Sequence, residues 1–183
     1  MRFASLGSGS RGNALVVEVG STRVLLDAGF GPREMTRRLA RQGLVPADIA
    51  AVLVTHEHAD HAGGAFSCGR SFGWEIRLTH GTLAACQARR GAEKIELVDS
   101  QASFSIGEIE VQPFPVPHDA REPVQFVFSN GDRRLGVLTD AGHVTAHIVA
   151  QLDACDALVL ECNHSAAMLA EGPYPAALKR RIG

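Results

Sequence analysis

Residues 55–64 read THEHADHAGG and follow IAAVLV at residues 49–54, an apolar run rich in β-branched side chains. Such a run predicts a strand that is buried on both faces. Side chains two apart in an extended segment point the same way, so His56 and His58 can bind one ion from the end of this strand. We therefore expect a buried strand to carry metal ligands to the edge of a sheet.

The same stretch adds Asp60 and His61, which turn with the chain toward a neighbouring point. Imidazole and carboxylate groups are ligands of zinc and of other borderline divalent ions. The two pairs therefore predict two adjacent metal sites. The spacing differs from the helical H-E-x-x-H of metalloproteases, because the residue four after His56 is an aspartate.

Composition is that of an ordinary globular protein: 183 residues, 45% hydrophobic, with a formal net charge of −2. We expect one domain over residues 1–183. The small net charge argues against bulk electrostatic coating of nucleic acid or membrane. The four cysteines form no CxxC, no apolar run is long enough to span a membrane, and no secretory signal precedes the first strand, so we expect a cytoplasmic protein with reduced thiols.

Strand and helix patterns alternate up to residue 99, and strands without intervening helices follow after residue 100. This order predicts a layered α/β protein. We expect helices in residues 32–43, 61–72, 81–91 and 145–154, and a hairpin at SNGD in residues 129–132. Asp-Ala-Gly ends an apolar strand twice, in residues 23–31 and 136–144, which hints at two related halves packed sheet against sheet.

Four motifs together resemble the metallo-β-lactamase superfamily: THEHADH after an apolar strand, LLDAG upstream of it, and PVPHD and LTDAG downstream. GSGSRGN, HDAREPVQFVF, LTDAGHV and LECNH more narrowly resemble its YycJ/WalJ-like branch, cytoplasmic bacterial proteins grouped with DNA-processing nucleases. The match runs from residue 3 to the last residue. It implies a four-layer αββα sandwich.

The resemblance also implies a binuclear site with two divalent ions, Zn²⁺ or Mn²⁺. His118 would complete the first site, and Asp140 would bridge both ions. Asp27 would be a structural aspartate that supports the histidine loop by hydrogen bonding without binding metal. The implied metal ligands are His56, His58, His118, Asp60, His61 and Asp140.

Members of this family carry one more histidine beyond the stretch that resembles residues 177–183, which implies that this domain is incomplete at its C-terminus and lacks its last elements. Alternatively, His143, His164 or water takes the place of that ligand. His143 and His164 are also candidates for catalysis, as a general acid or a phosphate contact. The competing interpretation is that each is a hydrogen-bonded histidine at the rim of the site.

The glycine-rich stretch at residues 7–13 could present backbone amides to a phosphate, with Ser10 and Asn13 as candidate contacts. It lacks the G-x-x-x-x-G-K-[ST] pattern of a nucleotide-binding loop. A plain turn between two strands explains it equally well.

The implied activity is hydrolysis by a metal-bridging hydroxide, which Asp60 can orient. The branch suggests a phosphodiesterase, an exonuclease on DNA or RNA. One alternative is a thioester or lactone hydrolase with the same metals, and another is a metal-binding module impaired by the missing ligand. Nucleic acid is then the expected partner, membranes are not, and a homodimer is possible.

Overall fold

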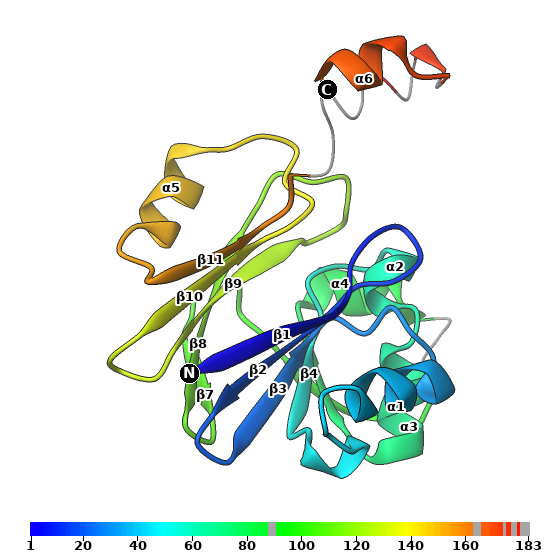
Figure 1. Cartoon of the computed structure of the whole chain (residues 1–183), viewed down its shortest axis with the longest axis vertical. Coiled ribbons are helices and arrows are strands. Elements are labelled where there is room, and N and C mark those ends of the chain that lie inside the picture. Colours follow the sequence, from blue (N-terminus) through cyan, green and yellow to red (C-terminus); the bar gives the residue numbers. More distant parts are fainter. Residues whose placement is uncertain (88–90, 163–165, 174, 177–178, 180–183) are drawn as a thin grey trace.

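The structure is a computed structural model that describes residues 1–87, 91–162, 166–173, 175–176 and 179 (Figure 1). Two β-sheets form its centre. The first sheet has the order β1-β2-β3-β4-β5-β6 and the second β11-β10-β9-β8-β7. The strands of the first sheet are β1 (Arg2–Gly7), β2 (Ala14–Val19), β3 (Thr22–Leu26), β4 (Ala51–Leu53), β5 (Glu75–Leu78) and β6 (Lys94–Leu97). Those of the second are β7 (Phe104–Ile106), β8 (Ile109–Pro115), β9 (Val124–Ser129), β10 (Arg134–Leu138) and β11 (Ala157–Leu160).

Helices lie on the outer faces of both sheets, whereas α6 (Ala166–Glu171) projects away from them (Figure 1). The other helices are α1 (Pro32–Ala40), α2 (Ala59–Ala62), α3 (Ala65–Phe72), α4 (His80–Ala85) and α5 (Ala146–Leu152), with a 3₁₀ turn at Pro46–Asp48. Helices α1 and α3 pack on the first sheet through Met35 and Phe66, and α5 packs on the second through Ile148. The expected αββα sandwich is confirmed.

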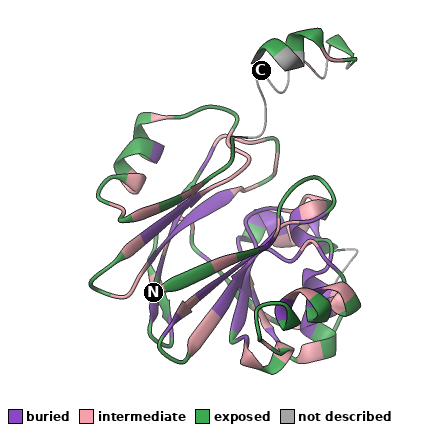
Figure 2. Ribbon diagram, in the orientation of Figure 1, coloured by how far each residue is buried: buried purple, intermediate pink, exposed green. Residues whose placement is uncertain are grey.

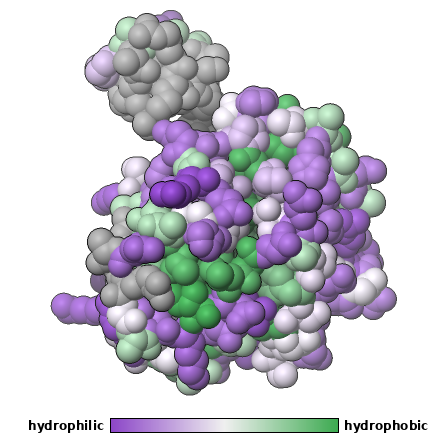
Figure 3. Space-filling model, turned by 180° about the vertical axis from the view of Figure 1, so that it is seen from behind, coloured by the Kyte–Doolittle hydropathy of each residue, from purple (hydrophilic) through white to green (hydrophobic). Residues whose placement is uncertain are grey.

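The core consists of an apolar layer between the sheets and one layer on the outer side of each. Phe126 and Phe128 of β9 meet Val24 and Leu53 of the first sheet in the central layer. Figure 2 shows inner strands such as β2, β4 and β9 buried along most of their length, whereas β1 is largely exposed. On the face opposite to that of Figure 1, apolar residues gather in one patch framed by hydrophilic ones (Figure 3).

Strand direction brings the chemically active loops to one rim. Strands β3, β4 and β5 run parallel, so their carboxyl ends meet at the same edge of the first sheet. Strands β8 and β10 both run antiparallel to β9, so their carboxyl ends also lie together. The ends of β3, β4, β8 and β10 lead respectively to Asp27, His56, His118 and Asp140.

The prediction of one helix over residues 61–72 is wrong in one respect. The structure has two helices there, α2 and α3, separated by Gly63 and Gly64. The loop after β3 crosses at this break, since Gly64 N donates to Ala28 O at 2.7 Å. A Cβ on Gly64 would lie 1.8 Å from the Phe30 carbonyl oxygen. The glycine pair therefore allows the backbone of residues 28–30 to pass against the histidine loop.

The predicted SNGD hairpin is confirmed, since β9 and β10 pair antiparallel on either side of it. The Asp-Ala-Gly echo also has a structural counterpart. Asp27 follows β3 and Asp140 follows β10, and both adopt left-handed backbone conformations, with φ of 61° and 48°. Aspartate tolerates this conformation better than most residues do.

None of the helices in the described ranges has the length and apolarity needed to cross a bilayer.

Candidate metal centre

Four histidine rings gather at the rim where the two sheets meet. The His56 ring is central, with centroids 4.5 Å from His58, 4.3 Å from His61 and 4.7 Å from His118. Two groups of ligand atoms have the spacing needed to hold an ion, each with its atoms within 4.8 Å of one another. They are His56, His58 and His118, and His56, His61 and Asp140.

His56 is the group that best fits a metal ion. Thr55 Oγ1 lies 2.9 Å from His56 Nδ1 and 3.0 Å from both carboxylate oxygens of Asp27. Because the hydroxyl donates to the carboxylate, it accepts from His56 Nδ1, which leaves the lone pair on Nε2. His56 Nε2 is buried and has no hydrogen-bond partner. A buried nitrogen lone pair facing other imidazoles is what a bound divalent cation would satisfy.

Asp27 orients the second histidine of the cluster as well. It is 3% exposed, and its Oδ2 accepts a hydrogen bond from His61 Nδ1 at 2.7 Å. Thr55 N donates to its Oδ1 at 2.8 Å. His61 Nε2 then points into the site, 2.9 Å from Asp140 Oδ2. A carboxylate that fixes the tautomer and direction of two imidazoles has the geometry of an outer-shell partner of metal ligands.

Electrostatics sets the protonation of the two buried histidines in opposite directions. Burial and the nearby His61 lower the pKa of His56 to about 3. Burial alone would also lower the pKa of His61, but Asp27 and Asp140 outweigh it and raise that pKa to about 11. At neutral pH His56 is therefore ready to donate a lone pair, whereas His61 must first release a proton.

The other two shifts concern His118 and Asp140. Burial lowers the pKa of His118, which keeps its ring neutral, and its Nε2 lies 3.3 Å from His58 Nδ1. Burial alone would raise the pKa of Asp140, but the hydrogen bond and charge of His61 bring it below the ordinary value. Both groups thus favour the protonation state that binds cations.

Asp60 lies at the margin of the second group. Its Oδ2 is 3.5 Å from His61 Nε2, and Asn13 Nδ2 donates to the same oxygen at 3.1 Å. Asn13 also accepts from Gly9 N through Oδ1 and donates from its backbone to Asp60 O. Asn13 thus joins the glycine-rich turn to Asp60, whereas Ser10 is exposed at the tip of that turn.

Three residues of the site were missed or misjudged from the sequence alone. Glu57 Oε1 accepts from Arg121 N at 2.8 Å and so connects the histidine loop to the loop of His118. Thr55 bridges Asp27 and His56 as described. Glu161 Oε2 accepts from Asp140 N at 2.6 Å. The sequence indicates these three roles only weakly, because each role depends on a partner far away along the chain or on the geometry of a turn.

His143 is exposed in the loop between β10 and α5. His164 falls outside the residues that the structure describes. Asp119, next to His118, places its Oδ1 3.6 Å from His118 Nε2 and 3.9 Å from His58 Nε2, which adds a carboxylate at the mouth of the site.

Comparison with known proteins places this geometry in a family. Residues 22–173 match the model of the beta-lactamase superfamily domain. Exodeoxyribonuclease YycJ of Bacillus anthracis is 34% identical over 188 residues, covering 100% of this chain and 70% of the relative. Exodeoxyribonuclease WalJ of Streptococcus pneumoniae is 30% identical over 186 residues, covering 99% and 69%.

Solved structures show the same fold. The short form of human tRNase Z superposes with a TM-score of 0.69 at 17% identity, covering 98% of this chain and 88% of the other. Zn²⁺-bound PqqB from Methylobacterium extorquens gives 0.68 at 21% identity, covering 83% and 62%. The chain belongs to the metallo-β-lactamase superfamily of metal-dependent hydrolases, with YycJ and WalJ among its relatives.

Proposed function

We propose that this protein is a binuclear metal-dependent phosphodiesterase, an exonuclease that acts on DNA. The observation that carries the proposal is the cluster of ligand atoms at the rim: His56, His58 and His118 form one group around the unpartnered Nε2 of His56, and His61 lies beside them with Asp140 and Asp60. Kinship with two exodeoxyribonucleases at 30% identity or more favours DNA as the substrate.

In this proposal, His56, His58 and His118 would hold one ion, and His61, Asp140 and Asp60 a second. Two divalent ions, Zn²⁺ or Mn²⁺, would make a hydroxide nucleophile available at neutral pH. The donor set of imidazoles and carboxylates fits both ions. The chain therefore needs no serine or cysteine nucleophile.

The protein's own residues set the geometry of attack. Asp27 and Thr55 keep the histidine tautomers that present nitrogen lone pairs to the site. Asn13 holds the Asp60 carboxylate, so that its other oxygen can accept a hydrogen bond from the attacking water. We assign Ser10, exposed on the glycine-rich turn, to a phosphate of the substrate strand.

His143 is our candidate for the proton donor to the leaving oxygen. It lies on the same loop as Asp140 and is exposed, so a substrate at the rim can reach it. Its replacement should reduce turnover while leaving metal content unchanged. His164, outside the described residues, stays a second candidate for the same role.

The test is release of nucleotides from end-labelled DNA and RNA with added Mn²⁺ or Zn²⁺, alongside a generic thioester. We expect DNA hydrolysis that is lost in His58→Ala and Asp60→Ala, with the thermal unfolding temperature little changed. His80→Ala, an exposed histidine at the start of α4, is the matched control and should retain full activity. Thioester hydrolysis without DNA hydrolysis would favour the thioesterase alternative instead.

We also propose a cytoplasmic location. The homodimer suggested by the sequence stays a prediction, which sedimentation of the purified protein can test.

A further inference from the structure

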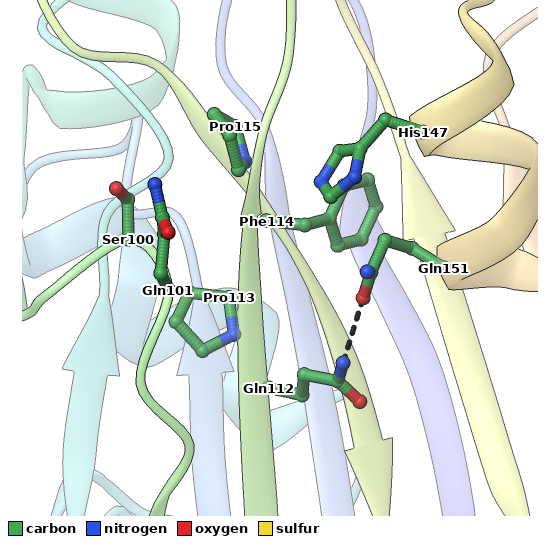
Figure 4. A pocket seen from close by; sticks show the side chains of 8 residues that line it. All are labelled: Ser100, Gln101, Gln112, Pro113, Phe114, Pro115, His147 and Gln151. Atoms are coloured by element: carbon green, nitrogen blue, oxygen red, sulfur yellow. Dashed lines mark hydrogen bonds between the residues drawn. The ribbon is translucent and has the colours of Figure 1, made fainter.

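A second hollow lies outside the metal centre, over the last residues of β8 and beside α5 (Figure 4). Its volume is about 510 Å³. This lies in the range of pockets that hold small organic groups. Its walls come from three segments: the end of β8, one face of α5, and Ser100 and Gln101 of the loop after β6.

Two of these walls lead directly to the proposed metal ligands. Pro115 ends β8 and precedes His118 by three residues, a reach of at most about 11 Å. Helix α5 begins shortly after Asp140, in the same loop. Gly142 N donates to Pro117 O at 2.6 Å and holds the two segments together. A polymer whose backbone lies at the metal centre could therefore place a neighbouring unit in this hollow.

The free edge of β8 at this place is unsuited to a peptide. Pairing between β7 and β8 ends at Val111, so the edge of residues 112–115 has no neighbouring strand in the described sheet. Pro113 and Pro115 have no N–H to donate to an added strand. The hollow is thus better suited to a compact group than to an extended chain that joins the sheet.

Among the described residues, the lining contains no aspartate, glutamate, lysine or arginine, which favours an uncharged ligand over a phosphate. The exposed His147 ring packs edge-on against Phe114, with centroids 6.4 Å apart, and so offers its other face to the hollow (Figure 4). In that view β8 lies between Pro115 and His147, so the flat face available for stacking is that of His147.

Polar groups at the bottom of the hollow are fixed in direction. Gln112 Nε2 donates to Gln151 Oε1 at 2.7 Å, which orients both amides (Figure 4). The pair still has Gln112 Oε1 as an acceptor and Gln151 Nε2 as a donor for a ligand. A flat face for stacking together with a donor and an acceptor along one edge is what a nucleobase requires.

We propose that this hollow, the base pocket, holds one nucleobase of the DNA strand whose backbone lies at the metal centre. The base stacks on His147 and hydrogen-bonds to the Gln112–Gln151 pair. The proposal rests on the proposed function and adds to it a substrate subsite. It predicts that the enzyme senses a base at one fixed position relative to the scissile phosphodiester.

The experiment uses end-labelled single-stranded DNA, complete or with one abasic position moved along the strand a nucleotide at a time. For the wild-type protein, an abasic site at one position should raise KM about fivefold or more, as loss of one stacking contact does. His147→Ala should raise KM on complete DNA by a similar factor and remove the sensitivity to that abasic site. Its kcat should change little, because the metal ligands are untouched.

Val149→Ala is the matched control, since Val149 lies on the same helix, is 60% exposed and does not line the pocket. It should leave both KM values unchanged. An unchanged KM in His147→Ala, an equal loss on complete and abasic DNA, or no position-dependent effect would overturn the base pocket. If the wild-type protein cleaves no DNA at all, the proposed function itself fails and the base pocket fails with it.

Discussion

Residues 27–29 and 140–142 both read Asp-Ala-Gly, and each tripeptide follows the end of a strand, one in each sheet. Both aspartates have left-handed backbones, and both contact the His61 ring, at opposite nitrogens. They differ in burial, since the side chain of Asp27 is 5% exposed and that of Asp140 26%. Asp27 is enclosed by hydrogen-bond donors of the protein, whereas Asp140 faces the open rim. The two aspartates thus share their local sequence and backbone conformation. The burial of their side chains distinguishes a supporting aspartate, Asp27, from a proposed metal ligand, Asp140.

The largest effect should come from the exposed member of the pair. Asp140→Asn removes the negative charge that the second ion requires, so we expect DNA hydrolysis to fall below detection. The unfolding temperature should change little, because the side chain lies at the rim and contributes little to the core. Nucleotide release and thermal unfolding measured on one preparation check this. Retained hydrolysis would mean that Asp140 has only a supporting role, like Asp27.

Asp27→Ala should combine a loss of activity with a loss of stability. The buried His61 loses the more buried of its two carboxylate partners, and breaking such a buried pair costs about 3 kcal/mol. Metal affinity should fall by about 10- to 100-fold, as for other outer-shell partners. Urea unfolding of the metal-free protein and a metal titration measure the two effects. Stability equal to that of the wild type would remove the distinction between the two aspartates.

The glycines of the two tripeptides differ in how closely the neighbouring backbone packs against them. A Cβ on Gly29 would lie 1.9 Å from the Asp60 carbonyl oxygen, whereas one on Gly142 would lie 3.1 Å from that of Pro117. Gly29→Ala should therefore destabilise the fold by about 2 kcal/mol or more and displace the histidine loop. Gly142→Ala is the matched control and should cost less than about 1 kcal/mol. Equal unfolding free energies in the two variants would contradict this packing.

The smallest expected effect concerns the protonation of His61. In the metal-free protein, the pKa of His61 is about 11, above the value of about 6.5 for an unfolded chain. Its ion pairs therefore stabilise the fold fully below about pH 6.5, and this contribution declines as the pH rises toward 11. Metal binding needs the deprotonated ring, so affinity should rise with pH across this range, by up to about tenfold per unit.

Calorimetry in two buffers of different ionisation heat measures the proton released when metal binds near neutral pH. We expect about one proton per chain from His61. The His58→Ala variant should still release it, because His61 and both its carboxylates are intact. Metal binding without proton release would show that His61 is neutral before the ion arrives.

Much of the fold and of the candidate site follows from the sequence for physical reasons. Alternation of strand and helix patterns predicted the layers, and the two-residue period after a buried strand predicted that His56 and His58 would lie together. The different roles of Asp27 and Asp140 came only from family resemblance, because identical tripeptides carry no local difference. The Glu57 contact joins residues 64 positions apart, and the division into α2 and α3 depends on a crossing loop. Such features depend on tertiary neighbours that a local pattern does not encode.

In the proposed enzyme, two ions in this cluster are required for exonuclease activity on DNA. The most direct measurement titrates the metal-free protein with Mn²⁺ while following nucleotide release from end-labelled single-stranded DNA. We predict no release without metal, little with one equivalent, and full activity only as the second equivalent binds. Release that persists in a chelator, or that is complete at one equivalent, would contradict the binuclear site.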